Sequence, residues 1–189
     1  MDIPSDTLDI VFNFIKTRVS DANSDGVVLG LSGGIDSAVT LSLAVNALGS
    51  DRVTGLIMPF NVTGSVELAT NHAKSLNVDT KIIQIKDIVS SYKDESSLFS
   101  EQLSEGNLHS RVRMSLLYGA GFSSNYLVIG TSNKSELLIG YWTKWGDGGT
   151  DFLPIGDLYK SQVFELGKVL DVPSEILIRK PTAELWLDQ

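Results

Sequence analysis

Residues Val27–Ser37, with the sequence VVLGLSGGIDS, decide the fold of this chain. The apolar run predicts a short buried strand, Gly33 and Gly34 predict a tight turn, and the residues after them predict the first turn of a helix. Backbone N–H groups and the positive end of the helix dipole meet at such a turn, so the turn attracts anions. Ser32 and Ser37 add hydroxyl donors, and glycine lets the backbone approach a phosphate closely. We therefore expect a phosphate or pyrophosphate site in this loop.

Asp36 is the unusual member of the loop, because a carboxylate next to a phosphate is repulsive unless a divalent cation lies between them. The Walker loop places a lysine just after its glycines, where this chain has Ile35 and Asp36. The dinucleotide fingerprint G-x-G-x-x-G is absent as well, since Gly30 and the glycine pair have another spacing. The loop therefore favours attack at the α-phosphate of a nucleotide, with pyrophosphate held as the leaving group.

The composition is that of an ordinary globular protein. The 189 residues, 42% hydrophobic and 20% charged, suffice for one domain with a sizeable core. The net charge of -8 argues against a broad grip on nucleic acid or on an anionic membrane. The absence of cysteine excludes disulfides, zinc–thiolate sites and a thiol nucleophile. No apolar run could span a bilayer, so we expect a cytoplasmic protein with no nucleic acid and no membrane partner.

Strands and helices are predicted to alternate along the chain. Strands are expected at the start of Val27–Ser37 and over 53–58, 80–85 and 126–129, and helices over 8–19, 38–48, 69–76, 107–118, 135–141 and 161–170. Four apolar strands between helices predict an α/β fold, with a parallel sheet covered on both faces. Lys93–Glu105, rich in Ser and Glu, is interpreted as a mobile connection, and Tyr141–Asp157, rich in glycine, aspartate and aromatic residues, as an active-site loop.

Ligands of such sheets bind beyond the carboxyl ends of the strands, where the strand order reverses. The glycine loop follows the first predicted strand, Met58 and Pro59 close the second, and Gly130 and Thr131 follow the fourth. We expect these strand ends to meet in one crevice.

Ser32–Ser37, SGGIDS, resembles the SGGxDS loop of the ATP pyrophosphatases, which adenylate a substrate and then displace AMP with a nitrogen or sulfur nucleophile. Later segments are similar, more specifically, to ammonia-dependent NAD synthetase: Gly130–Tyr141 (GTSNKSELLIGY), 143–144, 146–148, Asp151, 153–156, 158–160, 181–186, and Asn107 with Arg111–Met114 and Tyr118. The resemblance implies one NAD synthetase-like domain over residues 1–189. It also implies a doubly wound, Rossmann-like sheet of the adenine nucleotide alpha hydrolase-like type.

This resemblance implies a ligase that makes NAD in two steps, as the last step of NAD biosynthesis. The nicotinate carboxylate of deamido-NAD attacks the α-phosphate of ATP and releases pyrophosphate, and ammonia then displaces AMP from the adenylate. ATP is the co-substrate, Mg²⁺ the cofactor, and a second copy of the chain the partner in a homodimer. Ammonia would be free or delivered by a partner, since 189 residues without cysteine leave no place for a glutaminase domain.

The resemblance also assigns site residues. Contacts to ATP are implied for Gly30, Leu31, Ser32, Gly33, Gly34, Ile35, Asp36, Ser37, Thr131, Lys160 and Thr182. Mg²⁺ ligands are implied for Asp36 and Glu136, and deamido-NAD contacts for Arg111, Lys144 and Asp151. Asp36, Lys160 and Asp151 are the implied catalytic residues: Lys160 supplies the cation that the loop lacks, and Asp151 holds a ribose or takes a proton from ammonium.

Simpler roles stay open for several of these side chains. Glu136 could be a first-turn carboxylate favoured by the helix dipole, and Thr131 and Thr182 could be cap or turn residues. Lys160 could be a solvated lysine at a helix start. Trp145, which stands where the family often has Tyr, could stack on the pyridine ring or be an exposed loop aromatic.

Three further side chains receive no role. His72 is expected in the core or at its rim, because it lies on an apolar helical face. His109 is expected to be exposed. Arg113 is expected on a solvated helix face, with a phosphate contact as the alternative.

The resemblance weakens at the end of the chain, where the family continues into a further loop and a helix. This chain ends Leu185–Gln189, with Asp188 in place of the usual glycine, so we expect it to lack that tail, as a fragment or a short form. The alternative functions are another ATP pyrophosphatase, of the GMP-synthetase-like or tRNA-thiolating kind, and an inactive nucleotide-binding module.

Overall fold

A computed structural model describes residues 3–179 of the chain. Within these residues a parallel sheet has the strand order β3-β2-β1-β4, with β1 at Gly26–Gly30, β2 at Val53–Ile57, β3 at Asp79–Ile82 and β4 at Tyr126–Val128. The chain winds outward from β1 to β3 and then crosses back, so that β4 joins β1 on its free side. The strand order therefore reverses between β1 and β4. The predicted α/β fold with a doubly wound parallel sheet is confirmed.

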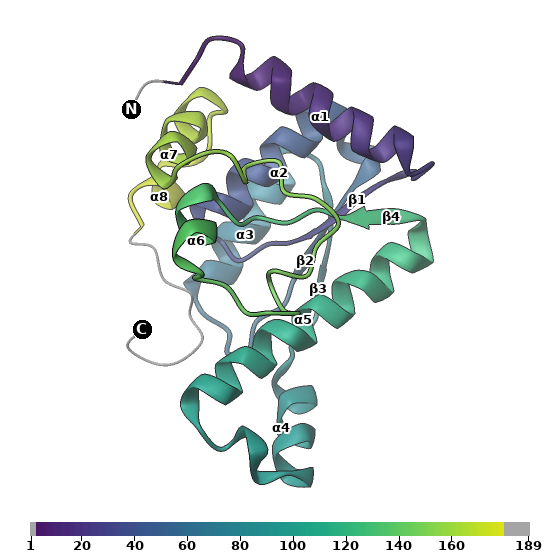
Figure 1. Cartoon of the computed structure of the whole chain (residues 1–189), viewed down its shortest axis with the longest axis vertical. Helices are drawn as coiled ribbons and strands as arrows, with labels where there is room; N and C mark the ends of the chain where they lie inside the picture. The colour runs from purple at the N-terminus through teal and green to yellow at the C-terminus, as the bar shows by residue number, and fades with distance from the viewer. Residues whose placement is uncertain (1–2, 180–189) are drawn as a thin grey trace.

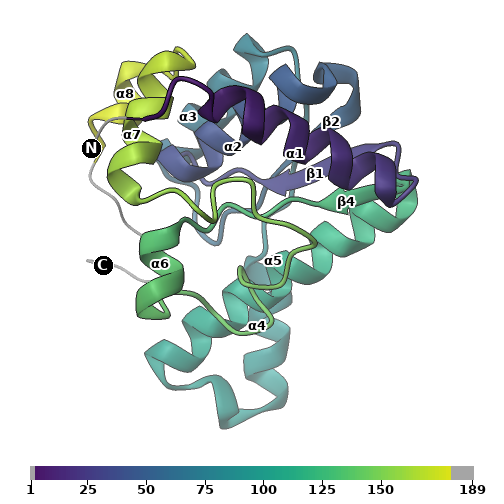
Figure 2. The same ribbon diagram turned by 45° about the horizontal axis from the view of Figure 1, so that its top comes forward.

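Helices cover both faces of the sheet because side chains along each strand alternate between the faces. Val27 and Leu29 of β1 belong to one core cluster, and Val28 belongs to the other. The first face carries α1 (Thr7–Asp21), α2 (Ile35–Leu48), α3 (Gly64–Ser75), α7 (Lys160–Val169) and α8 (Ser174–Leu177). The second face carries α4 (Lys86–Glu95) and α5 (Gln102–Ser124), which extend beyond the sheet in Figures 1 and 2.

The predicted helices are present, but two further ones were missed. α4 and α8 were not predicted; Val89 and Ile176 are their only fully buried residues, so their apolar pattern is weak. The segment interpreted as a mobile connection, Lys93–Glu105, contains the end of α4, the 3₁₀ turn Ser97–Phe99 and the start of α5. An ion pair of 2.7 Å between Lys93 Nζ and Glu105 Oε2 joins its two ends. Only a short connection therefore separates α4 from α5.

β3 differs from the buried apolar strand that was expected. It occupies Asp79–Ile82 in place of 80–85, and Asp79, Lys81 and Ile82 are exposed. The reason is its position at the edge of the sheet, paired on one side with β2. Another short 3₁₀ turn, Ser50–Arg52, leads into β2.

The short helix α6 (Lys134–Ile139) and the start of α7 lie at the end of the sheet to which β4 points (Figures 1 and 2). Hydrogen bonds fix this arrangement: Gly130 N donates to Phe152 O at 2.9 Å, and Lys134 N donates to Leu158 O at 2.8 Å. The segments after β4 are thereby held against the carboxyl ends of the strands. Within residues 3–179, no helix has the length and apolar character needed to cross a membrane.

Candidate active site

The glycine loop joins β1 to α2 as predicted. Gly33 has φ +76°, and a Cβ at this position would lie 2.4 Å from Ser65 O, so this position requires glycine. The loop is held by its own hydroxyls: Gly34 N donates to Ser32 Oγ at 3.2 Å, and Ser37 Oγ donates to Gly34 O at 3.0 Å. In the described part of the chain no side chain caps the start of α2. The first N–H groups of α2 are therefore available to an anion.

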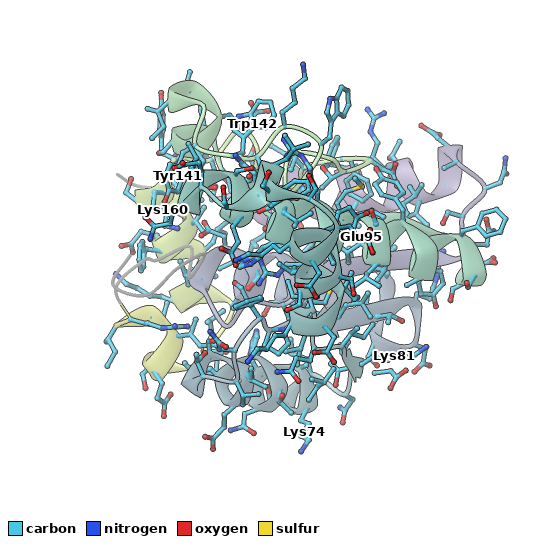
Figure 3. The ribbon with its side chains drawn as sticks, turned by 90° about the horizontal axis from the view of Figure 1, so that it is seen from below. Lys74, Lys81, Glu95, Tyr141, Trp142 and Lys160 are labelled. Carbon is cyan, nitrogen blue, oxygen red and sulfur yellow. The ribbon has the colours of Figure 1, made fainter. Side chains whose placement is uncertain are left out.

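Asp36, Glu136 and Lys160 come together beside this loop. Asp36 lies in the first turn of α2, Glu136 in the first turn of α6, and Lys160 is the first residue of α7. The Lys160 ammonium forms a close ion pair with Asp36 Oδ2 and lies 3.8 Å from Glu136 Oε1. Figure 3 labels Lys160 on the same side of the molecule as Tyr141, which lies two residues after the end of α6. Segments from both halves of the chain therefore meet beside the glycine loop.

Asn133 links these carboxylates, and sequence reasoning missed it. It is fully buried at the N-cap of α6. Its Nδ2 donates to Asp36 Oδ1 at 3.0 Å, its Oδ1 accepts from Glu136 N at 3.1 Å, and its backbone N donates to Glu136 Oε2 at 3.2 Å. An Asn followed three residues later by Glu is a capping signature, so the cap could have been found from the sequence. The contact between Asn133 and Asp36 could not have been found from the sequence.

The carboxylate pair fits a magnesium ion. Both carboxylates face one ammonium group, so both lie within reach of one common cation. Burial raises the pKa of Glu136, and the neighbouring Asp36 carboxylate acts in the same direction. Residues 3–179 contain no group of three or more His, Asp or Glu side chains able to hold a metal ion. A pair suits Mg²⁺, which proteins bind through one or two carboxylates with phosphate oxygens and water as further ligands.

A second group of predicted residues lies where the loop 141–151 packs on α5. Arg111 Nε donates to Lys144 O at 3.3 Å, and Thr143 Oγ1 donates to Asn107 Oδ1 at 2.7 Å. A Cβ on Gly146 would lie 2.7 Å from Ser110 Cβ, which shows how closely the loop approaches α5. The helix thus presents a row of polar side chains to this loop.

Asp151 is held at the far end of the same row. Its Oδ1 accepts from the Tyr118 hydroxyl at 3.1 Å, and its Oδ2 accepts from Val128 N of β4 at 2.7 Å. Burial, reinforced by Asp151, raises the pKa of Tyr118 to about 12, so the tyrosine stays a hydrogen-bond donor at neutral pH. Among the described residues, no hydrogen bond or ion pair connects Asp151 with Asp36 or Lys160. The predicted catalytic residues therefore form two groups.

Two predicted ATP contacts and one candidate stacking residue remain to be placed. Thr131 is half-buried, and Thr182 lies outside the described residues, as does the rest of 181–186. Trp145 is 67% exposed and has φ +60°, an unusual conformation for a bulky residue that concentrates at functional sites. The Nζ atom of Lys144 lies 5.7 Å from the centre of the Trp145 ring.

The structure corrects two expectations and supports a third. His109 is buried, not exposed; it stacks on Phe60 at 4.3 Å, and burial lowers its pKa to about 4. Arg113 does not lie on a solvated face, because it is half-buried and its Nε donates to Met58 O at 2.9 Å. His72 is a core residue as expected, with Nε2 3.2 Å from both Ser42 Oγ and Ala38 O.

A phosphate loop at the switch in strand order, with an acidic pair and a lysine beside it, defines a nucleotide-binding α/β protein of the Rossmann-like class. The position of the lysine, on a distant helix and not in the loop, separates it from the Walker type. The family model described as NAD synthase matches residues 7–189, and the chain belongs to the NAD synthase family.

Individual relatives agree with this assignment. The chain is 53% identical over 182 residues to the NH(3)-dependent NAD(+) synthetase of Archaeoglobus fulgidus, covering 95% of this chain and 73% of that protein. Among solved structures it is similar to an NMN synthetase from Francisella tularensis, with TM-score 0.93 and 38% identity over 100% of this chain and 79% of that one. It is also similar to an NH3-dependent NAD synthetase from Campylobacter jejuni, with TM-score 0.87 and 42% identity over 90% of this chain and 75% of that one.

Proposed function

We propose that this chain is an ammonia-dependent NAD synthetase, a ligase that uses ATP to amidate deamido-NAD. The observation that carries the proposal is the meeting of Asp36, Glu136 and Lys160 beside the glycine loop, in a chain of the NAD synthase family. The loop binds the phosphates of ATP through backbone N–H groups, and these residues supply the charges that the loop itself lacks.

In the first step the nicotinate carboxylate attacks the α-phosphate of ATP, giving an adenylate and pyrophosphate. The N–H groups at the start of α2 bind the departing pyrophosphate, and Lys160 balances the negative charge that develops on it. Asp36 and Glu136 would hold Mg²⁺, which when bound would supply positive charge to stabilise the negative phosphate groups. Thr131 and Thr182 complete the ATP contacts.

In the second step ammonia attacks the activated carbonyl, the C–N bond forms, and AMP leaves with the oxygen through which it was attached. Arg111 and Lys144 hold deamido-NAD along α5. Asp151 takes the proton that the nitrogen loses, and the Tyr118 hydroxyl keeps its carboxylate oriented. Ammonia reaches the site free or from a partner protein.

A mononucleotide is the second candidate substrate. The observation that favours it is the similarity, at TM-score 0.93, to the structure described as an NMN synthetase. The same two steps on nicotinate mononucleotide would give nicotinamide mononucleotide. The two substrates differ in the AMP half, so the relative kcat/KM for deamido-NAD and nicotinate mononucleotide distinguishes them.

We also propose that the chain acts as a homodimer in the cytoplasm, on the strength of the family resemblance. Phe122, near the end of α5, is 92% exposed. An exposed aromatic side chain of this kind supports a contact between this helix and a second copy of the chain. A hollow of about 430 Å³ lies between the sheet and α5 and is lined by residues such as Ser115 and Gly119. Sedimentation velocity at several protein concentrations tests the dimer, and a monomer at every concentration would contradict it.

The activity test mixes the protein with Mg-ATP, deamido-NAD and ammonium, and measures NAD, AMP and pyrophosphate. Equal amounts of the three products support the ligase. Binding of ATP without turnover would favour the inactive module, and turnover only with another acceptor would favour another ATP pyrophosphatase. Asp36→Asn should abolish Mg²⁺-dependent adenylation without unfolding the protein, whereas the control Asp51→Asn, at an exposed aspartate beside the amino end of β2, should leave it unchanged.

A further inference from the structure

The contacts of Asn133 divide the four carboxylate oxygens of Asp36 and Glu136 into two sets. Asp36 Oδ1 and Glu136 Oε2 accept hydrogen bonds from Asn133, from its side-chain amide and its backbone N–H respectively. Asp36 Oδ2 and Glu136 Oε1 are the oxygens that face the Lys160 ammonium. Each carboxylate thus has one oxygen bound to Asn133 and one oxygen turned toward the Lys160 ammonium.

The orientation of the Asn133 amide follows from its partners. An ionised carboxylate can only accept a hydrogen bond, so the NH₂ group must face Asp36. A backbone N–H can only donate, so the amide oxygen must face Glu136 N. Rotating the amide by half a turn would break both bonds at once. Because the side chain is fully buried, water cannot readily replace either bond.

We propose that Asn133 is a positioning residue that makes both carboxylates single-oxygen ligands and thereby favours Mg²⁺ over Ca²⁺ at this site. The inference rests on the proposed function, since it takes Asp36 and Glu136 as the metal ligands. Asn133 itself touches neither the metal nor the substrate; it acts through the two acidic side chains.

The chemical basis is the different geometry that the two ions accept. Mg²⁺ requires a small, nearly ideal octahedron, whereas Ca²⁺ accepts six to eight oxygens and often takes both oxygens of one carboxylate. A carboxylate with one oxygen bound to Asn133 cannot readily offer both oxygens to an ion. The arrangement therefore removes the bidentate contacts that favour the larger ion, while leaving the single contacts that suit the smaller one.

The test replaces Asn133 with Ser, which keeps a cap for α6 but cannot reach across to Asp36. Calorimetric titration with ATP, in saturating MgCl₂ and separately in saturating CaCl₂, gives the ratio of the two ATP dissociation constants. The wild type should bind ATP more tightly with Mg²⁺, and Asn133→Ser should reduce this preference about tenfold, as loss of a partner of a metal ligand commonly does. The control Asn46→Ser removes an amide of α2 that donates to Ser42 O of its own helix, and should leave the ratio unchanged.

A second variant, Asn133→Asp, keeps the acceptor for Glu136 N but cannot donate to Asp36, so it should lose the same preference. Inhibition of NAD formation by CaCl₂ at constant MgCl₂ gives a parallel measure, and both variants should be inhibited at lower Ca²⁺ concentrations. A Mg²⁺/Ca²⁺ ratio unchanged in both variants, or a wild type that does not distinguish the two ions, would overturn the proposal and leave Asn133 as a helix cap. A wild type that binds Mg-ATP but makes no NAD would refute the proposed function, while the calorimetric comparison would still decide the role of Asn133.

Discussion

Acidification should destabilise this protein through His109, a group outside the proposed active site. The ring is 1% exposed, and its pKa falls from 6.5 to about 4, mainly by burial. Arg113 and Lys93 lower this pKa further, whereas Glu105, whose Oε1 lies 3.8 Å from Nε2, opposes the change. As the pH falls from 6.5 to 4, the unfolded chain binds a proton that the native state does not, so native stability is lost over this window.

The size of the effect follows from the two pKa values. They differ by about 2.5, and each pKa unit corresponds to about 1.4 kcal/mol, so the full loss is about 3 kcal/mol. Between pH 7 and pH 5 the expected loss is about 2 kcal/mol, a large share of the usual 5–15 kcal/mol of a domain. Few carboxylates titrate in that range, which keeps their contribution small.

The assay is urea unfolding of the wild type and of His109→Leu at pH 7, 6 and 5. The variant loses the stacking on Phe60 at every pH, which changes its stability by the same amount throughout, and it should lose about 2 kcal/mol less than the wild type on acidification. His72, whose pKa is also lowered by burial, is present in both proteins, so it cancels in the comparison. Parallel pH profiles for the two proteins would refute the reasoning.

Three further predictions concern the proposed site. Lys160→Ala should slow pyrophosphate release in a single turnover by about 100-fold or more, and a change confined to KM for deamido-NAD would contradict the proposed role. Gly33→Ala should weaken ATP binding at least about tenfold in calorimetry, because the positive φ costs about 1–3 kcal/mol and the methyl meets Ser65 O; an unchanged affinity would show that the loop can move. Tyr118→Phe should reduce kcat/KM for deamido-NAD about fivefold, through loss of one hydrogen bond of about 1 kcal/mol to Asp151, and steady-state kinetics equal to the wild type would exclude that contact from catalysis.

Those parts of the fold and site that depend on local pattern were predictable from the sequence. The strand, turn and helix of Val27–Ser37 are specified by neighbouring residues, and the rule for parallel sheets then places the segment after β4 near the glycine loop. The meeting of Asp36 with Glu136 and Lys160 followed from the family resemblance together with this rule.

The features that depend on packing between distant segments were not predictable. His109 was expected to be exposed, and its stacking on Phe60, which follows β2 far away in the sequence, accompanies its burial. Arg113 is likewise held by a carbonyl at the end of β2. Asn133 contributes a local cap, which a pattern can reveal, and a contact 97 residues away, which a pattern cannot.

The strand order has a consequence for the synthesis of the protein. The phosphate loop leaves the ribosome early, but its partners follow 97 residues later at Asn133 and 124 residues later at Lys160. Until β4 adds to the free edge of β1, the nascent chain carries Asp36 without the side chains that orient and neutralise it. Tight nucleotide binding therefore reports completion of the sheet, and a chain cut in the connection 96–101 would regain it only when both pieces associate.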